Sequence, residues 1–360
     1  MSRILVINPG SKSTKIAMYE DSVQLWQQDI EHDAEVIDSY PTIYSQLEFR
    51  ADTVIESVKQ HGDRLEDLAC IMSRGGLLPP LSSGAYEVNE EMLDVLEHRP
   101  INHHASNLGA AIAYRLAVPL GIKAYIYDPV TVDEMIDIAR ITGLKEIRRH
   151  GQGHNLNMRA AALRYCSENG LNYKGSNLIV AHLGGGITLT LHSNGRIIDM
   201  VSDDEGPFSS ERVGLVPGYK LVKFAYMDGR DYGSMMKLMQ RQAGLISLIG
   251  EGDTRKVEAR IKDGDEEARL AYEAMALSVS KAIGTLSVVV DGKIDQIILT
   301  GGIANSGYFT GMIEERVKFI APVCIIPGEN EMQALADGAC RVLSGEETAK
   351  QYSEPAERPF

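Results

Sequence analysis

The 360-residue sequence has few of the features that mark membrane or secreted proteins. No uninterrupted apolar run approaches the roughly 18 residues that cross a bilayer, and the apolar run at 4–7 is too short for a signal-peptide core. Its four cysteines, at 70, 166, 324 and 340, lack the spacing of metal ligands and are interpreted as reduced thiols. We therefore expect a cytoplasmic globular chain, long enough for two domains.

Positive charge is also scarce. The 36 lysines and arginines are outnumbered by 50 acidic residues, and the net charge of −14 argues against nucleic acid as a partner. No basic helix-turn-helix segment precedes the first apolar run, so a transcriptional regulator is not indicated. An anionic ligand would need local cations, which makes Lys12, Lys15, Arg74 and Arg212 candidates because they lie in or beside expected loops.

The common nucleotide-binding motifs are missing too. No glycine is followed directly by Lys-Ser or Lys-Thr, and no G-x-G-x-x-G joins a strand to a helix. Most glycine-rich segments here join one expected strand to another. These absences disfavour Walker-type and Rossmann-type sites and leave a different phosphate-binding architecture as the expectation.

Residues 180–200 carry the strongest positive signal. An apolar run ends at Gly184, Gly185 and Gly186, an alternating segment follows at 187–192, and an Asn-Gly turn leads into Ile197. Alternation and an Asn-Gly turn are typical of a β-hairpin. Without Cβ atoms, the glycines let backbone N–H groups approach an anion closely.

The chain begins with a similar order of strand, loop and strand. Residues 4–7 are an apolar strand, 8–13 a polar loop rich in turn residues, and 14–19 a second strand. The repetition predicts a duplicated fold with a phosphate loop in each half and a cleft between the halves. Two unrelated hairpins are the alternative.

Polar residues also follow two short apolar strands. Arg74 and a Gly-Gly pair follow the strand at 68–72, and Asp128 follows the strand at 124–127, where carboxylates often act in α/β proteins. Each fits an ordinary turn as well when taken alone. Thr131 and Glu134 form a capping-box pattern that predicts a helix through 141.

The histidines do not form a metal-site pattern. His103 and His104 are adjacent and cannot face the same way on a helix, and glycines surround the pair at 150 and 154. One packed and one exposed histidine is the alternative for 103 and 104. A histidine beside the helix expected from 155 could meet a phosphate at the helix N-terminus.

Further helices are expected over 40–62, from 106, from 254, from 265 to about 290, and over 332–343. The long apolar stripe of the helix after Asp265 indicates core or a dimer interface. The polar tail at 344–360 is expected to be loosely held.

Several segments together resemble the butyrate kinases of the acetate kinase family, within the superfamily of sugar kinases, heat-shock proteins and actin. In chain order they are NPGSKSTKIA, SRGGLL, HHASNLGA, YDPVTVDEM, AHLGGGI, EGPFSSER, DTRKVE, LTGGIANS and PGENEM. The resemblance covers nearly the whole chain. It implies two ribonuclease H-like (actin-like ATPase) domains, ATP/ADP with Mg²⁺ in a central cleft, and reversible phosphorylation of butanoate to butanoyl phosphate.

The resemblance also implies roles in the first half of the chain. Asn8 would position the Mg–phosphate, and Arg74 would grip the acyl carboxylate or the phosphoryl group. Asp128 would lie near the metal, and Glu331 would hold Mg²⁺ through water, which makes Asn8, Asp128 and Glu331 the implied metal set. His103 matches a further active-site histidine, with a one-residue ambiguity toward His104. The implied first phosphate loop is Gly10, Ser11, Ser13 and Lys15.

For the second half the implied roles are of the same kind. His154 would hydrogen-bond the phosphoryl oxygens, and Arg212 would stabilise the transition state. The implied second phosphate loop is His182 with Gly184, Gly185 and Gly186. The residues implied around adenosine are Asp253, Arg255, Gly301, Gly302 and Ile303.

Four positions depart from the family pattern. Lys12 stands where a small hydroxyl residue is expected, and Arg212 precedes Val-Gly where Ser-Gly is usual. Gly153 replaces a phenylalanine that would line the acyl pocket, and Asn102 replaces a leucine. The last two changes lead us to expect a roomier pocket than acetate needs.

The leading interpretation is thus a butyrate or branched short-chain carboxylate kinase. An acetate or propanoate kinase and a non-kinase actin-like ATPase are the alternatives, and the second of these would not need arginines at 74 and 212. We expect a first domain of residues 1–145 plus 331–360, a second of 146–330, and homo-oligomerisation through the second. The expected partners are a short-chain carboxylate or its acyl phosphate, without nucleic acid or membrane.

Overall fold

The computed structural model describes residues 1–355, and the chain divides into two compact units. Unit 1 comprises Met1–Asp133 with the chain from Asn330 onward, and unit 2 comprises Glu134–Glu329. We expected the first domain to extend to residue 145. Residues from Glu134 belong instead with unit 2, because the Glu134 carboxylate accepts the backbone N–H of Ile197 at 2.9 Å and Ile136 N–H bonds Ile198 O.

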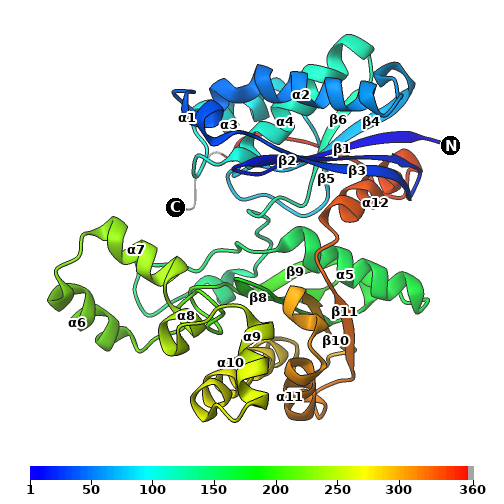
Figure 1. The fold of residues 1–360 in the computed structure, drawn as a ribbon. Helices are drawn as coiled ribbons and strands as arrows, with labels where there is room; N and C mark the ends of the chain where they lie inside the picture. Colours follow the sequence, from blue (N-terminus) through cyan, green and yellow to red (C-terminus); the bar gives the residue numbers. More distant parts are fainter. Residues whose placement is uncertain (356–360) are drawn as a thin grey trace. The chain divides into compact units, whose positions relative to one another are not determined.

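Unit 1 is built on a seven-stranded mixed sheet, ordered β12-β5-β6-β4-β1-β2-β3 (Figure 1). Strand β1 pairs antiparallel with β2 and parallel with β4, and β4 pairs parallel with β6. The bounds are β1 Arg3–Pro9, β2 Ser13–Glu20, β3 Val23–Glu31, β4 Leu68–Arg74, β5 Ala85–Glu87, β6 Lys123–Tyr127 and β12 Lys350–Gln351.

Unit 2 repeats the central five-strand pattern. Its sheet is ordered β11-β10-β7-β8-β9; β7 pairs antiparallel with β8 and parallel with β10, and β10 pairs parallel with β11. Its strands are β7 Leu178–Leu183, β8 Ile187–Ser193, β9 Arg196–Val201, β10 Gln296–Gly301 and β11 Val323–Pro327. The duplicated α/β fold expected from the two strand–loop–strand segments is confirmed.

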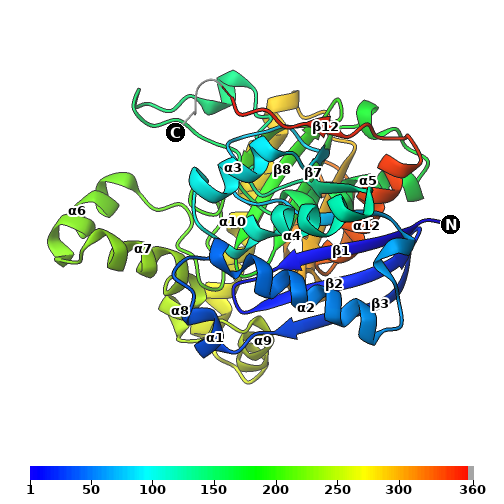
Figure 2. The same ribbon diagram turned by 90° about the horizontal axis from the view of Figure 1, so that it is seen from above.

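Helices cover both faces of the unit 1 sheet. Helices α2 (Leu47–Gln60) and α4 (Leu108–Ala117) pack on the face that carries Leu5, Ile7 and Ile71, as Figure 2 shows from above. Helix α12 (Glu331–Leu343) packs against β1 and β4, on the opposite face (Figure 1). The remaining helices of this unit are α1 Ala34–Asp38 and α3 Glu90–His98.

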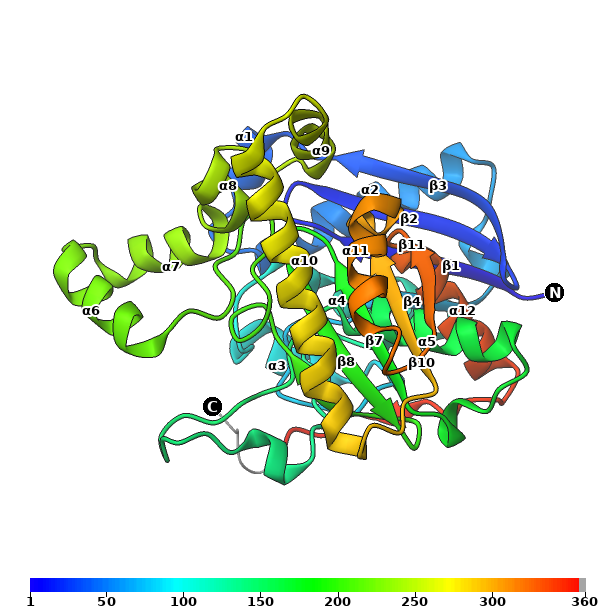
Figure 3. The ribbon, with the colours of Figure 1, turned by 90° about the horizontal axis from the view of Figure 1, so that it is seen from below.

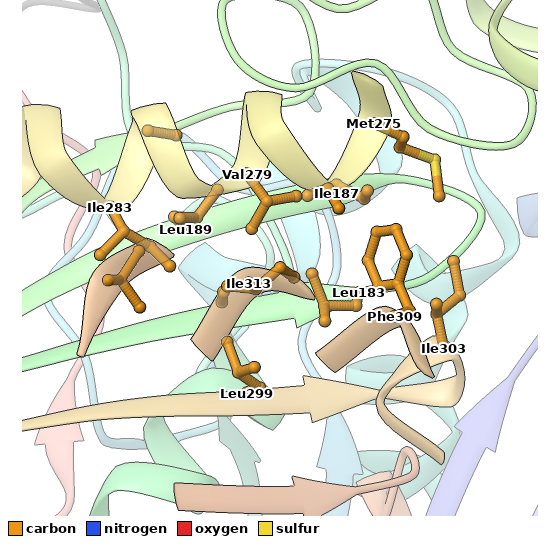
Figure 4. Packing of buried hydrophobic residues seen from close by; sticks show 14 of the residues in the cluster. Leu183, Ile187, Leu189, Met275, Val279, Ile283, Leu299, Ile303, Phe309 and Ile313 are labelled. Carbon is orange, nitrogen blue, oxygen red and sulfur yellow. The ribbon is translucent and has the colours of Figure 1, made fainter. Parts of the chain in front are cut away.

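The side chains of β7 alternate between the two faces of the unit 2 sheet. Ile179, Ala181 and Leu183 belong to the core beneath α10 (Glu266–Ser287) and α11 (Gly307–Val317), whereas Leu178 and Val180 pack with residues of α5 (Asn155–Glu168). Figure 3 looks onto α10 and α11, and Figure 4 shows Phe309 and Ile313 of α11 among the core side chains. This alternation places His182 on the α5 face.

Four more helices complete unit 2: α6 Gly218–Asp228, α7 Tyr232–Arg241, α8 Gly244–Ile249 and α9 Thr254–Lys262. Asp253 and Asp265 accept backbone N–H groups at the N-termini of α9 and α10, so both expected starts are confirmed. Single 3-10 turns occur at Tyr44–Gln46, Leu65–Asp67, Ala105–Asn107, Val118–Leu120, Asp137–Arg140, Tyr173–Gly175, Val288–Val290 and Gly302–Asn305.

One helical stretch, Glu266–Val290, is long and apolar enough by composition to cross a membrane. Its stripe of Tyr272, Met275, Val279, Ile283 and Leu286 is buried in the core of unit 2. The stripe expected to be core or dimer interface is therefore core.

Two local predictions were wrong. Residues 131–141 form no helix apart from the 3-10 turn Asp137–Arg140, because Glu134 binds the N–H of Ile197 and Asp133 N–H bonds Leu81 O. The helix expected over 40–62 begins only at Leu47, after the separate turn Tyr44–Gln46.

The tail was also expected to be loosely held, and its described part is not. Residues Lys350–Gln351 pair with β5, Tyr352 is buried, and the Glu347 carboxylate accepts Tyr127 Oη at 2.7 Å and the N–H of Ala85 at 3.0 Å. These partners lie more than 200 positions away in the sequence, so no local pattern could have indicated them.

Helix α12 lies so close to β6 that Gly338 has no room for a side chain. A Cβ there would lie 2.7 Å from Tyr127 Cδ2, whereas a Cβ at Gly311 of α11 would meet nothing within 4 Å. Gly338→Ala should destabilise unit 1 by about 1–3 kcal/mol through overpacking. Gly311→Ala should stabilise unit 2 by about 0.5–1 kcal/mol through helix propensity. Denaturant unfolding of both variants measures this; equal effects would contradict the packing described.

Candidate functional site

The first candidate loop joins β1 to β2 at residues 10–13. Gly10 N–H donates to Ser13 O at 2.8 Å, and this bond closes a tight turn. The side chains of Ser11 and Lys12 are exposed, and the Lys15 ammonium lies 4.0 Å from Asp29. Gly10, Ser11 and Ser13 lie in this turn, and Lys15 follows in β2 with its side chain about half exposed beside Asp29.

Arg50 of α2 lies directly beneath this loop and was missed from the sequence. Its guanidinium is fully buried and donates to Gly10 O at 3.0 Å, Ser13 O at 3.1 Å and Ser11 O at 3.3 Å. It also binds Thr14 Oγ1 at 3.1 Å and Gln46 Oε1 at 3.0 Å. An available signal was its place beside Ala51 and Val54 in the buried stripe of α2.

Asn8, Arg74 and Glu331 meet at one edge of the unit 1 sheet. They come from the end of β1, the end of β4 and the first turn of α12. Glu331 Oε2 accepts Asn8 Nδ2 at 2.8 Å and Arg74 Nη1 at 3.0 Å, and Arg74 Nη1 also lies 2.9 Å from Oε1. Three residues separated by up to 323 positions thus form one cluster.

The backbone of Arg74 is fixed by α4. A Cβ at Gly109 would lie 2.6 Å from Arg74 O, and a Cβ at Gly75 would lie 2.5 Å from Pro129 Cβ. Only glycine fits at both positions, so these contacts determine where the arginine leaves β4. The Gly-Gly turn is a packing requirement as well as a flexible link.

Asp128 is buried at the end of β6 in a left-handed conformation, with φ of 38°. Its Oδ1 accepts Gly84 N–H at 2.6 Å, and its own N–H reaches Gly84 O at 3.3 Å. A non-glycine residue at positive φ stores strain, which is frequent at functional sites. The structure therefore holds Asp128 in one fixed orientation.

Of the adjacent histidines, His104 is the one with described contacts. Its Nδ1 lies 2.9 Å from Ser106 Oγ and accepts Ser106 N–H, and both histidines are exposed at the surface. Burial and, less strongly, the positive charge of Arg74 lower the pKa of His104. His104 is thus the histidine with contacts to Ser106 and with Arg74 nearby, within the one-residue ambiguity stated for His103.

In unit 2 the second candidate loop joins β7 to β8. His182, at the end of β7, is buried, and Gly184, Gly185 and Gly186 follow. A Cβ at Gly186 would lie 3.1 Å from Arg212 Nε and 3.4 Å from His154 Cε1. The structure therefore brings His154, Arg212 and the glycine turn together.

His154 and His182 stack face to face, with ring centroids 3.8 Å apart and planes inclined by 6°. Thr188 Oγ1 lies 2.9 Å from His154 Nδ1, and Asn157 Nδ2 lies 3.0 Å from His182 Nδ1. The Nε2 atom of His182 lies 3.2 Å from a Glu329 oxygen. Thr188 and Asn157 orient the two rings, and no motif in the sequence singled out either residue.

Arg212 is paired with Asp203, at 2.6 Å between Nη1 and Oδ2. Burial raises the pKa of Asp203, and the nearby Arg212 charge opposes this shift. Ser209 supports the same segment, because its hydroxyl donates to Gly185 O and accepts Arg212 N–H at 3.1 Å.

The residues predicted around adenosine lie on two linked segments. Asp253 and Arg255 begin α9, and the exposed Arg255 guanidinium donates to Asp253, which lowers the pKa of Asp253 to about 2. Glu258 of α9 accepts the hydroxyl of Ser306, which follows the turn of Gly301, Gly302 and Ile303. Gly301 has φ of 89°, and a Cβ there would lie 2.5 Å from Leu183 O.

The inference drawn from Gly153 needs correction. A Cβ at this position would lie 2.9 Å from Met200 Cε and 3.2 Å from Thr188 Cγ2. The space is filled by the buried Met200 side chain, so the missing aromatic leaves no open cavity there. Gly153 therefore gives no support for a roomier acyl pocket.

The predicted metal set can be tested on donor chemistry. Mg²⁺ prefers oxygen ligands and usually keeps several waters around one or two carboxylates. Asn8 and Glu331 meet this requirement, since an amide and a carboxylate lie in contact beside the first loop. Within residues 1–355, no group of three or more His, Cys, Asp or Glu side chains could enclose a metal.

Comparison with known proteins gives one family match and three similar solved structures. Residues 138–346 match the family described as the Acetokinase family. An acetate kinase from Porphyromonas gingivalis has a similar fold, with a TM-score of 0.76, 19% identity, and coverage of 94% of this chain and 99% of that one. A propionate kinase from Francisella tularensis subsp. tularensis SCHU S4 has a TM-score of 0.74 and 20% identity, with coverage of 94% of this chain and 99% of that one. An acetate kinase from Entamoeba histolytica has a TM-score of 0.73 and 16% identity, with coverage of 94% of this chain and 98% of that one.

Proposed function

Because the chain belongs to the acetokinase family, whose members phosphorylate carboxylates with ATP, we propose that it is a kinase for butanoate or a branched short-chain acid. The reaction is reversible, direct in-line transfer of the phosphoryl group between ATP and the carboxylate. The main support for this proposal is the position of the two arginines: Arg74 lies in the cluster with Asn8 and Glu331, and Arg212 lies beside His154 and Gly186. A nucleotide-binding protein that never handled a second anion would not need both arginines.

In unit 1, Arg74 supplies a planar fork of donors for the carboxylate or the migrating phosphoryl group. Asn8 and Glu331 would hold Mg²⁺ with its waters, and the fixed Asp128 side chain would orient those waters. A bound Mg²⁺ neutralises phosphate charge as it develops in the transition state. Arg74 must exchange its Glu331 partner for substrate, which the partial exposure of both side chains permits.

In unit 2, His154 would donate to a phosphoryl oxygen from a ring held by Thr188 and the stacked His182. Arg212 would leave Asp203 to neutralise charge on the equatorial oxygens. The N–H groups of Gly184, Gly185 and Gly186 would bind nucleotide phosphate. The carboxylate nucleophile is already ionised at neutral pH, so no general base is required. We also propose His104, in place of His103, as the further histidine near Arg74.

The alternatives are an acetate or propanoate kinase and a non-kinase actin-like ATPase. The similar solved structures are two acetate kinases and a propionate kinase, which favours the first alternative. Butanoate is supported by the segment-by-segment resemblance to butyrate kinases and by Asn102.

The activity can be tested by trapping acyl phosphate as hydroxamate. Wild-type protein with Mg-ATP and butanoate should form the hydroxamate. Arg74→Lys should lower kcat/KM by about 100-fold or more, because a lysine cannot form the bidentate contact. The exposed Arg64→Lys is the matched control and should retain full activity. ATP hydrolysis without hydroxamate would refute the kinase assignment and favour the ATPase.

Acyl preference follows from kcat/KM for acetate, propanoate, butanoate and isobutanoate. We expect butanoate or isobutanoate to exceed acetate by about 10-fold or more, since each added methylene in a fitting pocket contributes about 1–3 kcal/mol. A clear preference for acetate or propanoate would overturn the butanoate assignment and leave the carboxylate kinase intact.

We further propose a cytoplasmic homo-oligomer that associates through unit 2. None of the residues of α6 is buried within the described chain, and α6 projects from the sheet with α7 (Figure 3). Tyr219 is 97% exposed and Tyr226 is 87% exposed, and the exposed Val222 lies between them, three residues after Tyr219 and four before Tyr226, on the same face of the helix. Such an apolar helix face is typical of an interface with a second copy.

Replacing Tyr219 and Tyr226 together by serine should lower the mass of the assembly in sedimentation to that of one chain. Phe319→Ser, at an exposed position away from α6, should leave the mass unchanged. A wild-type mass of 39.5 kDa would contradict the oligomer outright.

A further inference from the structure

Arg50 is a buried cation without a carboxylate partner among residues 1–355. All five of its described hydrogen bonds go to neutral oxygens: three backbone carbonyls of residues 10–13, the Thr14 hydroxyl and the Gln46 amide. Burying an unpaired charge is costly, and burial lowers the pKa of Arg50 to about 10, so the group still carries its charge at neutral pH. A neutral donor could satisfy these acceptors at a lower free-energy cost of burial, so the positive charge itself needs a functional explanation.

The direction of these bonds determines the other face of the loop. In a planar trans peptide, the C=O of one residue and the N–H of the next point in opposite directions. The carbonyls of Gly10 and Ser11 point to the guanidinium, so the N–H groups of Ser11 and Lys12 point away from it. No acceptor for these two N–H groups occurs within the described part of the chain, and both residues are exposed.

We propose that Arg50 is a positioning residue for phosphate binding: it draws the carbonyls of the first loop inward, turns the Ser11 and Lys12 N–H groups toward a nucleotide phosphate, and adds positive charge behind them. This inference rests on the proposed function, which places nucleotide phosphate at this loop. It assigns Arg50 no contact with substrate. The oriented N–H groups and the buried charge act together, as in other backbone anion sites.

The inference differs from a purely structural role for Arg50. A residue that only anchored α2 would lower stability and leave nucleotide affinity in the folded protein unchanged. A residue that orients the loop changes affinity for Mg-nucleotide while the KM for the carboxylate stays constant, because Arg74 binds the carboxylate elsewhere. The split between these two constants separates the possibilities.

The experiment compares Arg50→Met and Arg50→Lys with wild-type full-length protein. Binding of a fluorescent ADP analogue with Mg²⁺ gives Kd, and hydroxamate kinetics give both KM values. We expect Arg50→Met to raise Kd by about 10–100-fold, the range for loss of a charge-assisted phosphate site. The Kd of Arg50→Lys should lie between those of wild type and Arg50→Met, because lysine restores the charge without the planar set of guanidinium donors. The control is Arg115→Met, at an exposed arginine that pairs with Glu48 of α2, and it should match wild type.

The outcomes separate this inference from the proposed function. Unchanged Kd in folded Arg50→Met, with normal wild-type kinase activity, overturns the role of Arg50 alone. Weakened nucleotide binding in the variant, with no acyl phosphate from wild type, supports Arg50 and refutes the kinase. If Arg50→Met does not fold, Arg50→Lys decides: a raised Kd supports the inference and an unchanged Kd contradicts it.

Discussion

In each repeat, the first strand pairs in parallel with a neighbouring strand, and this pairing positions the polar side chains of both units. Ile7 lies opposite Ser73 in the β1–β4 pair, and Thr300 lies opposite His182 in the β10–β7 pair. Carboxyl ends of parallel strands meet at one edge of a sheet. Each first strand then turns back into an antiparallel partner, so each unit presents one backbone loop beside one group of polar side chains.

Although the net charge of the chain is −14, two arginines of the candidate site are each paired with a nearby carboxylate. Arg74 and Arg212 are each held by a carboxylate, from Glu331 and Asp203, which keeps the guanidinium groups oriented. Both pairs are partly exposed, and partly exposed pairs exchange partners at modest cost. Arg50 is the exception, because its charge is buried beneath a loop and neutralised by no carboxylate in the described chain.

Local signals were enough to predict much of this. The glycines at 184–186, the caps at Asp253 and Asp265, and the strands at 4–7 and 180–183 follow from rules that act within a few residues. Long-range partners could not be predicted in this way. The Glu134 carboxylate accepts a hydrogen bond from the Ile197 N–H and does not cap a helix, and Gly153 lies against Met200. In both cases tertiary packing overrode the local pattern. The role of Arg50 could not be predicted for the same reason, since its acceptors belong to a loop about 40 positions earlier.

In the proposed mechanism, both strand–loop–strand turns bind phosphate through backbone N–H groups. Amide NMR of isotope-labelled protein, titrated with a non-hydrolysable ATP analogue and Mg²⁺, can detect this binding at each loop. We expect downfield shifts for the amides of Ser11 and Lys12 in one unit and of Gly185 and Gly186 in the other, at one common Kd. Shifts confined to one loop, or absent from both while nucleotide is bound, would contradict it.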